Sequence, residues 1–132
     1  MAKTPKSFGI KNHLGIFDKY GDPNVEKMTK FLSISRKELA ESFGLSPEQV
    51  RPERLSEAAK EKFRELAGIL EFVAEIFHGE STKALFWVKT PNPHFGGVSP
   101  REMIIRGRQR KVQSFVLAAM DENQLASREK VS

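Results

Sequence analysis

Glycine and proline residues divide this chain of 132 residues into short segments, and this division constrains its fold more than any other feature. Within most segments apolar residues recur every three or four positions, which is the spacing of one face of an α-helix. An alternation of apolar and polar residues, typical of a strand, occurs only in a short ambiguous piece at residues 9–17. The sequence therefore predicts an all-α fold.

The longest predicted helix covers residues 56–78, with Ser56 as its N-cap and Gly79 as its stop signal. Its apolar stripe widens in the second half, where Ile69 and Phe72 extend it. A helix that is apolar on more than one face is usually buried by two partners. The second half is therefore predicted to pack in the core between two lobes or, as the alternative, to form a dimer contact.

The positions of glycine, proline and apolar residues separate the chain into four predicted parts. These are a flexible N-terminal arm (1–23), a lobe of short helices (24–54), a lobe that begins with the long helix (55–121) and a polar C-terminal tail (122–132). Short helices are predicted in the first lobe at residues 24–32, 35–43 and 47–51, and they must pack together because each is too short to be stable alone. Five apolar residues of the arm are available to pack onto a neighbour: Phe8, Ile10, Leu14, Ile16 and Phe17.

The second lobe continues with three further predicted helices, at residues 81–89, 99–107 and 108–121. The apolar centre of the first of them, residues 84–88, is predicted to be enclosed. Two prolines and two glycines make residues 90–98 a loop. The next helix has a cap residue, a proline at its first position and a glutamate placed to complete a capping box, namely Ser99, Pro100 and Glu102.

The formal charge of +5 is concentrated in the arm and in residues 91–120. The latter stretch has one acidic residue, Glu102, against five basic ones: Arg101, Arg106, Arg108, Arg110 and Lys111. Such a stretch is compatible with an acidic protein partner, with phosphate contacts or with a solvated basic face.

The composition argues against several classes of protein. The absence of cysteine excludes disulfides, thiolate zinc sites, iron–sulfur clusters and a cysteine nucleophile. The three histidines are far apart in sequence, and no apolar run approaches the roughly 20 residues of a membrane-spanning helix. With no catalytic arrangement or cofactor fingerprint, the sequence predicts a cytoplasmic protein that is not an enzyme and binds no metal or cofactor.

The first motif is a possible helix-turn-helix at residues 36–55. Ala40 allows two helices to approach, Gly44 makes the turn and Val50 packs the second helix onto the first. This geometry would present three polar residues to a DNA major groove, namely Ser46, Gln49 and Arg51.

The chemistry of this motif is poor for DNA binding. Pro47 and Pro52 leave little more than one helical turn between them, and the acidic Glu48 and Glu53 would repel phosphates. A structural helical hairpin that binds no DNA is therefore the alternative.

The second motif lies in residues 87–107. It combines Trp87, Thr90-Pro91-Asn92-Pro93, Phe95-Gly96-Gly97, Ser99-Pro100-Arg101-Glu102 and Gly107, followed by an apolar-patterned helix. In order and spacing it resembles the toxin-binding domain of the Xre/MbcA/ParS antitoxin family, over roughly residues 55–121. The preceding helix-turn-helix corresponds to the Xre-like part of that family.

This resemblance implies an antitoxin of a type II toxin–antitoxin pair. Such antitoxins hold a RES-domain toxin, an enzyme that consumes NAD, in an inactive complex, and many repress their own operon, generally as dimers. The resemblance implies a toxin-binding lobe organised by Trp87, Asn92, Pro93, Gly96, Gly97, Ser99, Pro100 and Gly107. In some family members the C-terminal end enters the toxin active site, and here the residues for that role would be Arg128 or Lys130.

The residues themselves indicate a scaffold more than a set of contacts. Trp87 is predicted to be core, Asn92 to bind loop backbone, and the pair Gly96-Gly97 to supply positive φ angles or a close approach. The toxin contacts are then expected on Arg101, Arg106, Arg108, Arg110, Lys111 and the tail. The leading hypothesis is a homodimeric antitoxin that occludes its toxin, and the alternative is a helix-turn-helix regulator without a toxin partner.

Overall fold

The computed structural model describes residues 11–131, and the side chains of residues 11–122. In this part of the chain there are six α-helices: α1 (Val25–Leu32), α2 (Arg36–Ser42), α3 (Glu57–Ile76), α4 (Ser81–Lys89), α5 (Pro100–Ile105) and α6 (Gln109–Val131). Two single-turn 3₁₀ helices, η2 (Pro47–Gln49) and η3 (Pro93–Phe95), and an antiparallel pair of two-residue strands, β1 (Val50–Arg51) and β2 (Arg54–Leu55), complete it. The fold is mostly helical, as predicted, and the small hairpin departs from the all-α prediction.

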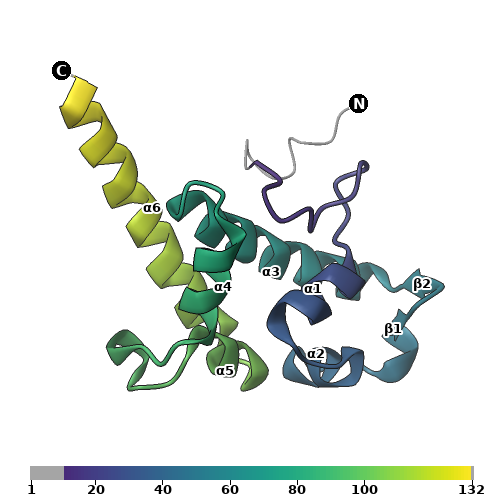
Figure 1. The fold of residues 1–132 in the computed structure, drawn as a ribbon. Helices are drawn as coiled ribbons and strands as arrows, with labels where there is room; N and C mark the ends of the chain where they lie inside the picture. Colours follow the sequence, from purple (N-terminus) through teal and green to yellow (C-terminus); the bar gives the residue numbers. More distant parts are fainter. Residues whose placement is uncertain (1–10, 132) are drawn as a thin grey trace.

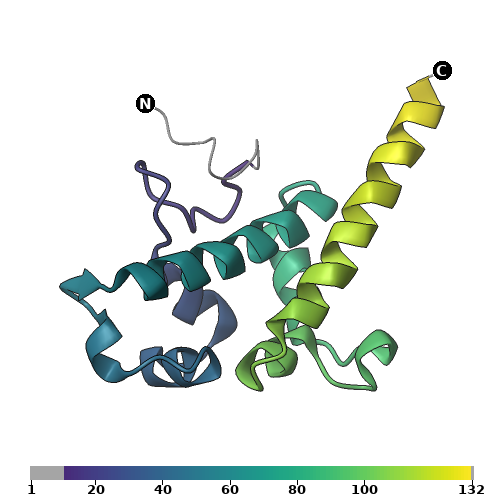
Figure 2. The same ribbon diagram turned by 180° about the vertical axis from the view of Figure 1, so that it is seen from behind.

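Helix α3 runs through the centre of the molecule (Figures 1 and 2). Its N-terminal end lies beside α1, α2 and the hairpin, and its C-terminal end packs against α6. Helices α4 and α5 fill the space between these groups, with α1 packed on α4 and α2 packed on α5. In both views the C-terminal half of α6 extends beyond the remaining helices.

The apolar stripe of α3 forms the middle of the core. Phe63, Leu66 and Leu70 are fully buried, and Ser56 caps the helix by accepting a hydrogen bond from the Ala59 N–H (3.0 Å). Ile69, which widens the stripe, is also buried within the chain. The intrachain interpretation of the wide apolar face is thereby confirmed for this residue. No helix in the described part of the chain has the length and hydrophobicity that crossing a membrane requires.

Residues 11–23 have little regular structure, yet they belong to the core. Ile16 and Phe17 are buried, and both oxygens of the Glu71 carboxylate accept the Leu14 N–H (3.0 and 3.1 Å). One of those oxygens also accepts the Ile16 N–H (3.1 Å), while His13 Nε2 lies 2.6 Å from Glu75 Oε1. Residues 11–17 are therefore held against α3 by these contacts. Phe8 and Ile10 lie outside the described residues.

Glu71 is the buried carboxylate that anchors this segment, and its side chain is 0% exposed. Burial raises the pKa of Glu71, and the backbone N–H groups of Leu14 and Ile16 act in the opposite direction by stabilising the anion. Sequence patterning did not single out this residue, because its partners lie more than fifty positions away.

Helix α6 is longer than predicted. It continues to Val131, whereas the apolar pattern predicted an end near Asp121 followed by a polar tail. The additional residues include Glu, Gln, Leu, Ala, Arg and Lys, which are good helix formers, and no glycine or proline interrupts them. The side chains of Arg128 and Lys130, the predicted toxin-plugging residues, lie outside the described part.

Candidate functional site

The predicted DNA-reading helix does not form. In its place, residues 47–49 make one 3₁₀ turn, and the chain then enters the hairpin in which Arg51 lies opposite Arg54. Proline is disfavoured inside a helix, and the residue before a proline avoids the helical region. Pro47 and Pro52 therefore limit this segment to one turn, and the prediction of a second helix is wrong.

The core expected for the helix-turn-helix is nevertheless present. Ala40 and Val50 are buried, and Gly44 makes the turn with a φ of 69°. The Gln49 side chain forms a hydrogen bond within the chain, because its carboxamide oxygen accepts the Ser46 N–H (3.0 Å). The sequence thus determined which residues pack together, but not the secondary structure that they adopt.

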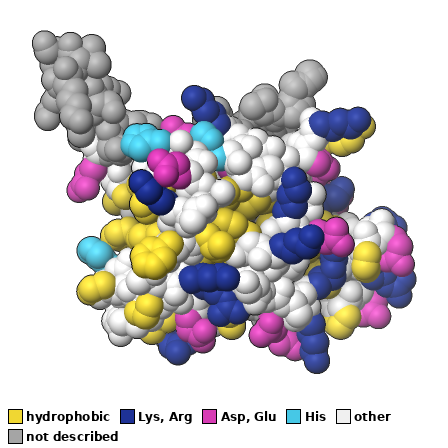
Figure 3. Space-filling view, in the orientation of Figure 1, with side chains coloured by type: hydrophobic (Ala, Val, Ile, Leu, Met, Phe, Trp, Pro, Cys, Tyr) yellow, Lys and Arg dark blue, Asp and Glu magenta, His cyan; other side chains and the backbone are white. Residues whose placement is uncertain are grey.

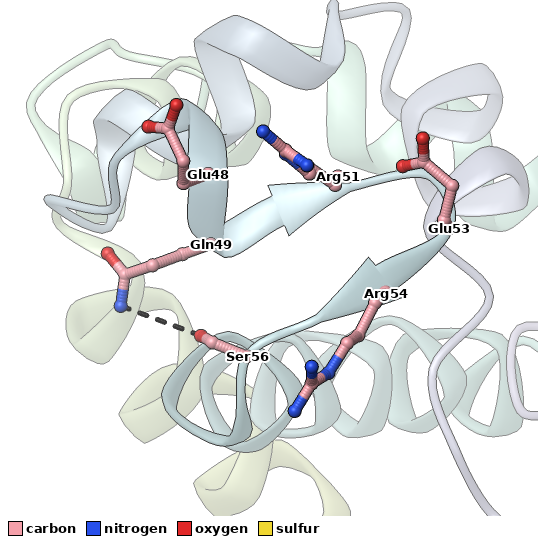
Figure 4. A pocket seen from close by; sticks show the side chains of 6 residues that line it. All are labelled: Glu48, Gln49, Arg51, Glu53, Arg54 and Ser56. Atoms are coloured by element: carbon pink, nitrogen blue, oxygen red, sulfur yellow. Dashed lines mark hydrogen bonds between the residues drawn. The ribbon is translucent and has the colours of Figure 1, made fainter.

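The hairpin borders an open hollow of about 610 Å³ (Figure 4). Two acidic and two basic side chains line it together with Gln49 and Ser56: Glu48, Glu53, Arg51 and Arg54. In Figure 4 the Arg51 side chain lies on the same side of the hairpin as Glu48 and Glu53, while Arg54 points the other way. The formal charges of these four side chains cancel, which is a poor match for a phosphate backbone.

The loop between α4 and α5 is organised by Asn92. Its side-chain oxygen accepts the His94 N–H (2.9 Å), its own N–H donates to the Val98 carbonyl (3.2 Å), and its carbonyl accepts the Gly97 N–H (3.0 Å). These contacts confirm that Asn92 holds the loop through backbone hydrogen bonds. They place η3 and His94 in one fixed position.

Three glycines of the motif meet different requirements. Gly96 and Gly97 have φ angles of 67° and 84°, and a Cβ at either would meet nothing within 4 Å, so the backbone conformation alone favours glycine there. Gly107 also has a positive φ (78°), and a Cβ there would lie 3.1 Å from the Ser42 carbonyl oxygen in α2. Gly107 therefore also allows a close approach between α2 and the end of α5.

Helix α5 begins as predicted. The Ser99 hydroxyl accepts the Glu102 N–H (3.0 Å), and Pro100 occupies the first helical position. The Glu102 side chain does not complete a capping box, because its carboxylate instead pairs with Arg106 Nε one turn later (3.3 Å). Arg106 is thus paired within the helix.

Arg101 is engaged inside the chain. Its Nη2 donates to the Ser33 carbonyl (2.7 Å) and its Nε donates to the Leu32 carbonyl, both at the C-terminal end of α1. A guanidinium at this end of a helix is favoured by the helix dipole. The sequence predicted Arg101 to be an exposed toxin contact, but in the structure its guanidinium joins α5 to α1. Beside it, Lys89 Nζ donates a hydrogen bond to the Ser33 hydroxyl (2.8 Å).

Three further basic residues, which follow the motif, are exposed. Arg108, Arg110 and Lys111 lie at the start of α6, whose first turn contains no acidic residue. Positive charge near a helix N-terminus is unfavourable in the field of the helix dipole. Of the five basic residues predicted as contacts, these three form no ion pair among the described side chains, and Arg106 is exposed as well.

Trp87 belongs to an aromatic cluster between α4, η3 and α6. Its ring stacks on Phe115, with centroids 5.8 Å apart and an interplanar angle of 13°. Phe115 also meets the edge of Phe95 at 5.7 Å and lies 4.6 Å from the ring of His94. Trp87 and Phe115 are only partly buried, so the cluster joins the core to the surface.

A recess of about 380 Å³ lies on this cluster, between η3 and the first turns of α6. Its lining residues are His94, Phe95, Arg110, Lys111, Ser114 and Phe115. None of the six is acidic, so aromatic surface and unbalanced positive charge occur together there.

Phe86 is an apolar residue that was predicted to be buried but is exposed. Residues 84–88 were predicted to be enclosed, and Ala84 and Val88 are buried, but the side chain of Phe86 is 73% exposed on the opposite face of α4. Hydrophobic side chains gather on the face of the molecule that displays α4 and α6 (Figure 3). A contiguous exposed apolar surface is typical of an interaction site, whereas a single exposed apolar residue is not.

Residues 73–113 match the family described as the antitoxin Xre/MbcA/ParS C-terminal toxin-binding domain. This part of the chain is similar to that antitoxin toxin-binding domain. The matched residues run from the second half of α3 through α4, the Asn92 loop and α5 to the first turns of α6. Comparisons with curated proteins and with solved structures find no match.

The similarity to a toxin-binding domain implies a cognate toxin as a partner of the chain. The antitoxin family is non-enzymatic, in agreement with the prediction that the chain is not an enzyme. Among the side chains of residues 11–122, no three acidic or histidine groups converge as a metal site would require. Exposed aromatic and basic groups therefore lie on α4, the Asn92 loop and the start of α6.

Proposed function

We propose that this chain is the antitoxin of a type II toxin–antitoxin pair and that it inhibits a RES-domain toxin, an enzyme that consumes NAD. The observation that carries the proposal is the match of residues 73–113 to an antitoxin toxin-binding domain. The antitoxin acts by steric occlusion, in the cytoplasm where the toxin finds NAD.

The surface that binds the toxin, in this proposal, comprises the outward face of α4 and the start of α6. Phe86 supplies an exposed apolar side chain, and Arg108, Arg110 and Lys111 supply positive charge. Large aromatic and arginine side chains dominate the energetics of many protein interfaces. Asn92, Pro93, Gly96, Gly97, Ser99, Pro100 and Gly107 act as the scaffold that holds this surface.

The test is co-expression with the protein encoded by the adjacent gene, which we expect to be a RES-type toxin. The antitoxin should restore both growth and the intracellular NAD concentration of cells that express the toxin. A matched variant, Phe86→Asp, should accumulate as folded protein but protect less, because it places a charge in the interface. An unrelated neighbouring gene, with no rescue of a RES-type toxin, would contradict the proposal.

Repression of the operon receives less support. The match begins at Val73 and does not include Ser46, Gln49 or Arg51, and these residues lie on a 3₁₀ turn and a hairpin with balanced charges. The homodimer likewise stays a prediction. It was suggested by the wide apolar face of α3, but at Ile69 that face is buried within the chain itself.

A further inference from the structure

We infer that the recess between η3 and α6 receives a toxin segment in which an apolar side chain lies next to a carboxylate. This inference rests on the proposed function and specifies the chemistry of the partner. The recess is bounded by His94 and Phe95 on one side and by Arg110, Lys111 and Ser114 on the other, with Phe115 between them.

The aromatic part of the recess is already formed in the free chain. The Phe115 ring is stacked on Trp87, and the rings of His94 and Phe95 approach it at 4.6 and 5.7 Å. The hydrogen bond from the His94 N–H to Asn92 fixes the loop that carries His94 and Phe95. The recess has a volume of about 380 Å³ and is open to solvent, so a side chain of a partner can reach it. An inserted apolar side chain would therefore pack on aromatic surfaces without rearranging the loop.

The charged part of the recess specifies a carboxylate. Arg110 and Lys111 line it in the first turn of α6, where the helix dipole favours negative charge and where the chain provides no acidic side chain. A carboxylate from the partner would pair with these two residues and with the dipole together. Of the six lining residues, four lie within the matched domain, and Ser114 and Phe115 follow it directly.

The inference is tested by calorimetric titration of the full chain with the purified RES-type toxin encoded beside it. One variant, Arg110→Glu with Lys111→Glu, reverses the charge, and another, Ser114→Trp, fills the recess from an exposed position. Each should weaken toxin binding about 100-fold, the effect expected when one partner of an interfacial charge pair or packing contact is lost.

The matched control is Arg51→Glu with Arg54→Glu, which makes the same charge change at the hairpin. It should alter toxin affinity by no more than about twofold, because exposed charges away from an interface contribute little. Circular dichroism and thermal unfolding of each variant establish that it is folded.

The outcomes separate this inference from the proposed function. If the wild-type chain binds the toxin and both recess variants bind equally well, the inference is overturned while the proposed function stands. If the control loses as much affinity as the recess variants, general electrostatic attraction explains binding and the inference is again overturned. If the wild-type chain does not bind the toxin, the proposed function itself fails.

Two other occupants are distinguished by the same variants. A second copy of the chain in the recess would appear as a change in sedimentation of the free protein upon Ser114→Trp, with toxin affinity unchanged. Nucleic acid would appear as salt-dependent binding of duplex DNA that is lost upon Arg110→Glu with Lys111→Glu. Either result, with toxin affinity unchanged, would overturn the inference.

Discussion

The hairpin and the recess each carry two basic residues, but their surroundings differ in kind. At the hairpin, Arg51 and Arg54 share a hollow with Glu48 and Glu53. At the recess, Arg110 and Lys111 lie beside aromatic rings and no acidic residue lines the same space. Positive charge thus becomes informative about a partner only where the chain does not neutralise it and where apolar surface accompanies it.

The two surfaces share one core, and this allows a change in the core to be distinguished from a change in either surface. The largest effect is expected for Glu71→Ala, which leaves the Leu14 and Ile16 N–H groups without their acceptor. The free energy of unfolding should fall by about 3 kcal/mol, since each unsatisfied buried donor costs about 1–3 kcal/mol. Urea denaturation measures this loss, and Glu75→Ala, at a half-exposed ion pair, is the milder control.

The pH dependence of stability sharpens this prediction. Burial raises the pKa of Glu71 above its usual value of 4.5, so the folded chain binds this proton more tightly than the unfolded chain does. The contribution of Glu71 to the free energy of unfolding is therefore fully present below pH 4.5 and decreases as pH rises through the raised pKa. The stability difference between the wild type and Glu71→Gln should grow as the pH is lowered through this window. A difference that stays constant would contradict the raised pKa.

The comparison between the surfaces is tested most simply by exposed aromatic residues. Phe86→Ala should weaken toxin binding about 30-fold, as expected for an interface residue that contributes about 2 kcal/mol. Tyr20→Ala is the matched control, because Tyr20 is 67% exposed but lies in the N-terminal segment. Surface plasmon resonance with immobilised toxin measures both. Equal losses for the two variants would remove the distinction between the surfaces.

The smallest expected effects come from two glycines, one near the hairpin and one in the Asn92 loop. Gly44 and Gly97 have φ angles of 69° and 84°, and an added Cβ would meet nothing within 4 Å at either. Each change to alanine should lower the free energy of unfolding by about 1 kcal/mol, because a side chain disfavours the left-handed conformation. Only Gly97→Ala should also weaken toxin binding, since it shifts the loop that carries His94. Thermal unfolding and the same binding assay compare the two variants.

The sequence predicted the Asn92 loop and the start of α5 well, because local chemistry determines both. A cap serine before a proline, an asparagine that binds nearby backbone and glycines with positive φ act over a few residues. The hairpin was missed although Pro47 and Pro52 were recognised as constraints. They shortened the helix so far that residues 50–55 adopted another structure.

The remaining errors concern contacts between distant residues. Glu71 binds backbone groups more than fifty positions away, and Arg101 binds carbonyls almost seventy positions away, so no local pattern contained either contact. Phe86 was assigned to the interior because its neighbours are apolar, although only Ala84 and Val88 lie on the inner face of α4. The recess was also beyond prediction from sequence, since it needs η3 and α6 placed side by side.

Hydrogen exchange of the full chain with and without the proposed RES-type toxin is the most direct test. The claim is that the toxin binds the surface formed by α4, the Asn92 loop and the start of α6. Residues 81–115 should become protected in the complex, while residues 46–56 should exchange as in the free chain. Protection confined to residues 46–56, or none at all in the presence of saturating toxin, would contradict it.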